Sequence, residues 1–189
     1  RGVAVLLMVM VHAAATWNPF KGDQETILAY LVSGLGGLAA PLFVTLFGWG
    51  MYRSKLNVKA RMFQATFLIF CQILVNISSP HLFNPLTPGI LSLMALLTII
   101  FPLIQYILIK LNKNIIILIL MVTFLFQILL PEIQGIGDWG DRVEDNSLRT
   151  ILSNLFLTGT YPLFPWFLLF TIGATISSLE TKSNQTLPV

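Results

Sequence analysis

Long uninterrupted apolar runs fill most of this chain of 189 residues, and they constrain its fold more than any other feature. Only 10% of the residues are charged, against roughly 25% in an ordinary soluble domain. Crossing the hydrocarbon core of a bilayer takes about 20 helical residues. Six runs have or approach that length, at positions 3–16, 28–52, 62–77, 89–109, 115–130 and 161–179.

These runs predict helices, because the strands of a membrane β-barrel alternate between apolar and polar residues over about ten positions. The runs at 62–77 and 115–130 have 16 residues each, so they require helix extension into polar flanks or local bilayer thinning. The apolar piece at 151–157 is too short to span and predicts an interfacial helix. We therefore expect an all-α fold: one polytopic transmembrane bundle of six spans over residues 1–189.

Charged residues indicate how the bundle is oriented. The loop 53–61 has four basic residues and no acid, and 110–113 has two lysines, whereas 131–149 has five acids and two arginines. By the positive-inside rule, the basic loops and both termini face the cytoplasm of a multi-pass protein in the cytoplasmic membrane. Anionic lipid headgroups account for the net charge of +3, so we expect no nucleic-acid partner.

Other potential sites are weak in this sequence. Cys71 is the single cysteine, which excludes an intrachain disulfide, and the acidic segment 131–149 lacks the spacing of a calcium loop, so we expect no metal. The chain begins with Arg1 at the start of a span, so we expect its natural N-terminus to lie upstream. Ser33, Gly37 and Pro41 recur every four residues, which predicts close approach of a neighbouring helix.

His12 is an ionisable residue within an apolar span, where such groups are costly and often functional. It follows Arg1 by eleven residues, which is about three turns and 20° of helix, so both lie on one face, about 16 Å apart. That rise places Arg1 at the cytoplasmic boundary and His12 at or beyond the middle of the membrane. The alternative is a histidine that only makes a hydrogen bond between packed helices.

Three segments carry a resemblance to a known family: RGVAVLLMVMVH, APLFVTLFGWGMYRSK and GTYPLFPWFLLFTIGATIS. In this order and spacing they resemble the catalytic membrane domain of the heparan-α-glucosaminide N-acetyltransferase family and its prokaryotic relatives. The spacing of Arg1 and His12 is also similar to that of acyltransferase 3 membrane enzymes. The resemblance implies acyl transfer from cytoplasmic acyl-CoA, with acetyl-CoA as the expected donor, to a sugar or glycan acceptor on the outer face.

The resemblance also implies roles for residues at the cytoplasmic side and in the membrane. His12 would be the catalytic group, either accepting a proton from the acceptor or becoming acylated itself. Arg1 would contact the phosphates of coenzyme A, and Arg53, Lys55 and Arg61 would add an anion-binding rim. The alternatives are a snorkelling Arg1 and a basic loop that is simply solvated.

Aromatic and histidine residues near the outer face are the candidate acceptor contacts: Trp17, His81, Tyr161 and Trp166. As alternatives, the aromatic residues would be interfacial anchors and His81 a solvated loop residue. Five amides within the spans are expected to form hydrogen bonds between helices: Gln64, Gln72, Asn76, Gln105 and Gln127.

A membrane protein without enzymatic activity, a small transporter or a scaffold, is the rival interpretation. Transporters often contain internal repeats with paired broken helices, and the two halves of this chain show no such repeat. A scaffold gives no reason for His12. The expected partners are the lipid bilayer, acyl-CoA and the acceptor, and a homodimer remains an open alternative to a monomer.

Overall fold

The computed structural model describes residues 2–16, 27–80, 83–110, 114, 117–118, 120–122, 124–125 and 147–186. All regular elements within these ranges are helical, which confirms the all-α fold class there. They are α1 (Gly2–Thr16), α2 (Ile27–Gly37), α3 (Ala39–Arg53), α4 (Val58–Ser78), α5 (Ile90–Lys110), α7 (Leu148–Ser153), the π-helical turn η3 (Asn154–Thr158) and α8 (Leu163–Thr186).

Four helical segments of the described chain are long and apolar enough to cross a membrane: Tyr30–Arg53, Val58–Ser78, Ile90–Lys110 and Leu163–Thr181. They correspond to four of the six expected spans. The expected first span forms α1, which has 15 residues, and the expected span 115–130 falls mostly outside the described residues. The piece expected at the interface, 151–157, forms parts of the short α7 and η3.

Helix α4 shows how a short apolar run reaches the length of a span. The expected run of 16 residues lies inside a helix of 21, which extends into polar residues at both ends. Asn57 caps the helix, because its side-chain oxygen accepts a hydrogen bond of 2.8 Å from the backbone N–H of Ala60. Extension into polar flanks therefore supplies the missing length.

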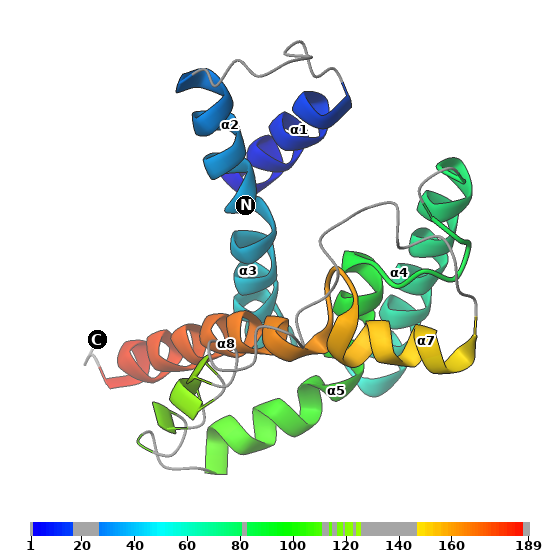
Figure 1. Ribbon diagram of the computed structural model, residues 1–189. Helices are drawn as coiled ribbons and strands as arrows, with labels where there is room; N and C mark the ends of the chain where they lie inside the picture. Colours follow the sequence, from blue (N-terminus) through cyan, green and yellow to red (C-terminus); the bar gives the residue numbers. More distant parts are fainter. Residues whose placement is uncertain are drawn as a thin grey trace.

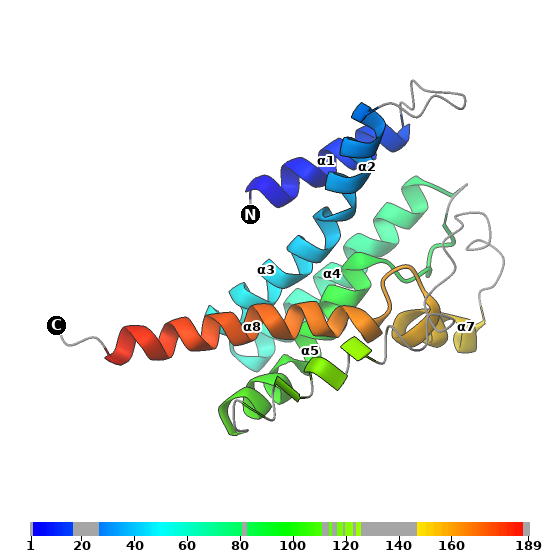
Figure 2. The same cartoon turned by 60° about the vertical axis from the view of Figure 1, so that its left-hand side comes forward.

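The second expected span is divided into two helices, α2 and α3, and Pro41 near the start of α3 explains the break. Proline lacks an N–H and its ring crowds the carbonyl four residues earlier, which here belongs to Gly37. Helix α2 ends at Gly37, and α3 begins two residues later, at Ala39. In both views α1 and α2 form one end of the molecule, and α3 runs from them to a crossing with α8 (Figure 1, Figure 2).

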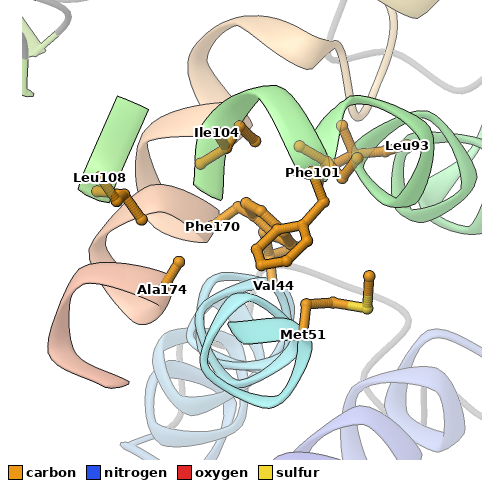
Figure 3. Close-up of a cluster of buried hydrophobic side chains, with 9 residues drawn as sticks. Val44, Met51, Leu93, Phe101, Ile104, Leu108, Phe170 and Ala174 are labelled. Atoms are coloured by element: carbon orange, nitrogen blue, oxygen red, sulfur yellow. The ribbon is translucent and has the colours of Figure 1, made fainter. Parts of the chain in front are cut away.

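The buried core lies where α3, α5 and α8 meet. Phe170 of α8 packs between Phe47 and Phe101, with ring centroids 5.7 and 6.0 Å away. Figure 3 shows Phe170, Phe101 and Val44 pointing toward one another from three helices. Packing around Phe170 therefore fixes these helices relative to one another.

Amides of α4 bond to α5 and to the segment before it, and one of the five expected amides, Gln72, makes the expected bond between helices. Gln72 Nε2 donates to Asn76 Oδ1 (2.9 Å), and Gln72 Oε1 accepts from the N–H of Leu91 at the start of α5 (3.1 Å). Asn76, 1% exposed, donates to the carbonyls of Pro85 and Thr87 (3.0 and 2.8 Å). These bonds satisfy backbone groups of the connection between α4 and α5 and of the first turn of α5.

Helix α8 is rich in hydroxyl groups, four of which it satisfies internally, whereas the buried Ser177 hydroxyl has no hydrogen-bond partner in the described chain. Thr171, Thr175, Ser178 and Thr181 each donate to a carbonyl three or four residues earlier in the helix, at 2.8 to 2.9 Å. A hydroxyl paired in this way needs no partner from lipid. This explains how a helix with so many polar residues remains long and apolar enough to span.

Two glycines bring the backbones of α3 and α8 together. A Cβ on Gly48 would overlap the carbonyl oxygen of Phe170, and a Cβ on Gly173 would overlap that of Thr45. The close approach expected at Gly37 is not found within the described chain, because a Cβ there would meet open space. Close helix contact occurs instead further along, at Gly48.

Replacing either contact glycine should separate the two helices. We expect Gly48→Ala and Gly173→Ala each to lower the free energy of unfolding by about 1–3 kcal/mol, because the added methyl group overlaps backbone. The measurement is thermal or denaturant unfolding of the purified protein in detergent. Gly34→Ala is the matched control, since its Cβ would have nothing within 4 Å; a loss of stability as large in the control would refute the explanation.

Candidate functional site

The ends of α3, α4 and α8 and the second half of α5 line an open pocket of about 550 Å³. Its lining includes three cations and no carboxylate. The lining residues are Tyr52, Arg53, Ser54, Lys55, Leu56, Arg61, Gln105 and Thr181. The structure thus gathers Arg53, Lys55 and Arg61, the residues predicted as an anion-binding rim, around one cavity.

Arg61, in the first turn of α4, is the most buried lining residue, 8% exposed. Its Nε donates a hydrogen bond of 3.2 Å to the carbonyl of Leu56, and its guanidinium carbon lies 4.7 Å from the centroid of the Phe101 ring. These two contacts hold the plane of the guanidinium group. Its Nη1 is enclosed and has no hydrogen-bond partner in the described part of the protein.

Arg53 has a different environment at the mouth of the pocket. Its Nη1 lies 3.6 Å from Glu180 Oε2, and its guanidinium lies 4.5 Å from the ring centroid of Trp49. The indole N–H of Trp49 donates to the same carboxylate oxygen at 3.0 Å. These contacts join the C-terminal end of α3 to α8 and compensate the charge of Arg53.

The charges of Arg53 and Arg61 are therefore balanced differently. Glu180 is the only acidic residue among those the structure describes, and it pairs with Arg53. Within those residues Arg61 has a carbonyl and an aromatic ring as partners, but no anion. A buried cation without an anion is costly, so this part of the site favours a negatively charged ligand.

His12 lies on α1, away from this pocket. Its Nδ1 is 2.7 Å from the carbonyl of Met8, and because a carbonyl only accepts, Nδ1 carries the hydrogen. In the neutral ring Nε2 is then the basic nitrogen. The ring is exposed, α1 contacts α2 and α3, and no residue of α1 lines the pocket. Arg1, Trp17 and His81 lie outside the described residues. The placement of Arg1 and His12 on one helix face therefore stays a prediction.

Tyr161 and Trp166 form a pair at the beginning of α8. Their ring centroids are 5.1 Å apart at an interplanar angle of 61°, an edge-to-face arrangement. Both are half-buried and pack against the core cluster. Thr181, which lines the pocket, follows Trp166 by fifteen residues, about 22 Å of helix, so the pair and the pocket lie toward opposite ends of the spanning segment Leu163–Thr181.

Sequence reasoning missed several residues of the pocket. Gln105 was expected to bond to another helix, but it lines the pocket and makes no hydrogen bond to another described residue. Tyr52, Thr181 and Glu180 were not singled out. The available signal was topological, because the basic loop after α3 and the end of the last span were both predicted to face the cytoplasm.

Comparison with known proteins identifies a family. The family described as heparan-alpha-glucosaminide N-acetyltransferase, catalytic, matches residues 1–188 of the chain. Neither the comparison with curated proteins nor that with solved structures gave a match. The family match covers nearly the whole chain and supports the resemblance seen in its three motifs.

Because Arg61 is buried without an anion, it should contribute little to folding. We expect Arg61→Met, which keeps the packing on Phe101 but removes the charge, to leave the free energy of unfolding unchanged or higher when no anionic ligand is present. Thermal unfolding in a neutral detergent measures this, with the exposed Lys59→Met as control. A clear loss of stability in Arg61→Met alone would mean that the charge is already compensated in the folded protein.

Proposed function

This chain belongs to the heparan-alpha-glucosaminide N-acetyltransferase catalytic family, and on that premise we propose that it transfers an acetyl group across a membrane. The donor is acetyl-CoA on the cytoplasmic side, and the acceptor is a sugar or glycan on the outer side. The family supports a membrane acetyltransferase; the donor, the acceptor and the two sides are our proposal.

The observation that carries the proposal is the placement of two different sites at the two ends of α8. A cationic pocket lies at one end, and the pair of Tyr161 and Trp166 lies at the other. Trp166 and Thr181 are fifteen residues apart, about 22 Å of helix, which covers most of the roughly 30 Å of a bilayer core. A protein that takes a charged donor from one side and a neutral acceptor from the other needs such an arrangement.

The cationic end suits the nucleotide part of the donor. Phosphate groups bind guanidinium and ammonium groups, so Arg53, Lys55 and Arg61 are the proposed contacts, together with Arg1. Coenzyme A carries its phosphates at one end and its thiol at the other. With the phosphates held in the pocket, the extended chain of the donor would bring the thioester toward the interior of the bundle.

The aromatic end suits a sugar, whose rings present apolar C–H faces that pack against aromatic side chains. Tyr161 and Trp166 present their rings at the start of α8, and both keep a polar N–H or O–H group. Trp17 and His81 are the further contacts proposed from the sequence. Their assignment rests on the predicted topology, which places all four residues at the outer face.

His12 is the proposed catalytic base. As the acceptor amine or hydroxyl attacks the thioester carbonyl, Nε2 takes its proton, a C–N or C–O bond forms, and the C–S bond breaks. The proton then passes to the leaving thiolate, which gives free coenzyme A. The bond from Nδ1 to Met8 supports this role, because it fixes the tautomer in which Nε2 is basic. Transfer through an acylated His12 uses the same nitrogen and remains the alternative route.

Substituting His12 tests the proposal. His12→Gln keeps a hydrogen-bonding amide but removes the titratable nitrogen, so we expect acetyl transfer to fall by about 10² to 10⁴-fold. Coenzyme A binding and thermal stability should not change. The measurement uses radiolabelled acetyl-CoA and glucosamine with the purified protein in detergent.

Ala13→Gln is the control, since it places the same amide at the neighbouring exposed position of α1. Its rate should equal that of the unsubstituted protein. Equal rates in His12→Gln as well would make His12 a packing residue and refute the mechanism.

A further inference from the structure

We infer that Arg61 and Gln105 form a subsite for a phosphate ester at the base of the pocket. The proposal separates these two residues from Arg53 and Lys55, which lie at the exposed mouth. It assigns the binding of one phosphate group to residues of α4 and α5, and it adds Gln105, an uncharged residue, to the cationic site.

The charge of Arg61 is not balanced by an anion within the described chain. The side chain is more than nine-tenths buried, its Nη1 has no hydrogen-bond partner in the described chain, and the described carboxylate, Glu180, is paired with Arg53. Gln64 Oε1, one turn along α4, is also enclosed without a partner. A bond between these two groups would satisfy a donor, but it would leave the cation uncompensated.

Contacts within the protein already fix the orientation of the Arg61 guanidinium group. Its Nε is occupied by the carbonyl of Leu56, and its plane packs on Phe101. A guanidinium held in this way loses little conformational entropy when an anion binds, and its planar donors match the oxygens of phosphate. Arg53 is less available to a ligand, because the ligand would have to compete with Glu180 for the Arg53 guanidinium group.

The cavity has the size and the polarity that an organic anion requires. About 550 Å³ is too large for a single inorganic ion and lies in the usual range of about 300–1,000 Å³ for organic ligands. Two of the three lining cations, Lys55 and Arg61, have no ion pair within the described chain, which favours an ester that carries more than one negative charge. The Gln105 amide, which has no partner among the described residues, can donate to a phosphate oxygen beside Arg61.

Two molecules carry such a phosphate ester to this end of the bundle. One is the acyl donor, whose nucleotide is phosphorylated, and this source rests on the proposed function. The other is the headgroup of an anionic lipid, which the pocket meets at the membrane boundary because Arg61 lies in the first turn of α4. The subsite chemistry is the same for both, so an experiment must separate them.

The experiment measures binding of coenzyme A to the complete chain in phosphatidylcholine nanodiscs by isothermal titration at fixed salt. Arg61→Met should raise the Kd about tenfold or more, because it removes charge-assisted hydrogen bonds. Gln105→Leu should raise it several-fold, and it tests the subsite even if Arg61→Met does not fold. Lys59→Met, an exposed cation of the same helix outside the pocket lining, should change the Kd less than twofold.

A second arm adds phosphatidylglycerol to the discs and counts the lipids that each purified variant retains, by native mass spectrometry. In one outcome, Arg61→Met and Gln105→Leu lose retained lipid and no variant binds coenzyme A. That outcome would support the subsite as a headgroup site and refute the donor part of the proposed function. Coenzyme A binding that is equal in all four proteins would refute the subsite and leave that function standing. Binding of neither ligand would refute both.

Discussion

The contact between α3 and α8 at Gly48 and Gly173 is the constraint on which the rest of this structure depends. It brings the backbones close enough that a Cβ on either glycine would overlap the opposite helix. This contact seats Phe170 against Phe101 of α5, and it brings Glu180 to Arg53 at the end of α3. The pocket forms where those helices end, so its geometry depends on the close contact at Gly48 and Gly173.

Folding and binding make opposite demands on the cationic end of the bundle. Arg53 is compensated by Glu180 and stacks on Trp49, so it links two helices. Arg61 is buried with no anion among the described residues, and such a charge is kept at a cost to stability. Natural proteins break the rules of local stability mostly at functional sites, which is why we place the ligand at Arg61.

Sequence reasoning predicted the helical class and located the four described spans, because the length of an apolar run is a local property of the chain. Arg53, Lys55 and Arg61, which sequence reasoning placed in one basic loop, line one pocket, whereas their role in binding stays a prediction. Sequence reasoning predicted close helix approach along Ser33, Gly37 and Pro41, but Gly37 faces open space and the close contact lies at Gly48, because the neighbour of a glycine is known only once the packing is known. The neighbours of Gln105 in the pocket lining and the hydrogen-bond partner of Glu180 come from segments distant in sequence, and no spacing rule predicts them.

The central claim is that the acetyl group passes from the pocket end of the bundle to the aromatic end. The most direct test uses sealed proteoliposomes containing uniformly oriented protein, with the cationic end outward, acetyl-CoA outside and glucosamine trapped inside. The account predicts acetylated glucosamine inside intact vesicles, and none when the protein has the opposite orientation. Product that forms only after the vesicles are permeabilised, whatever the orientation, would contradict transfer across the membrane.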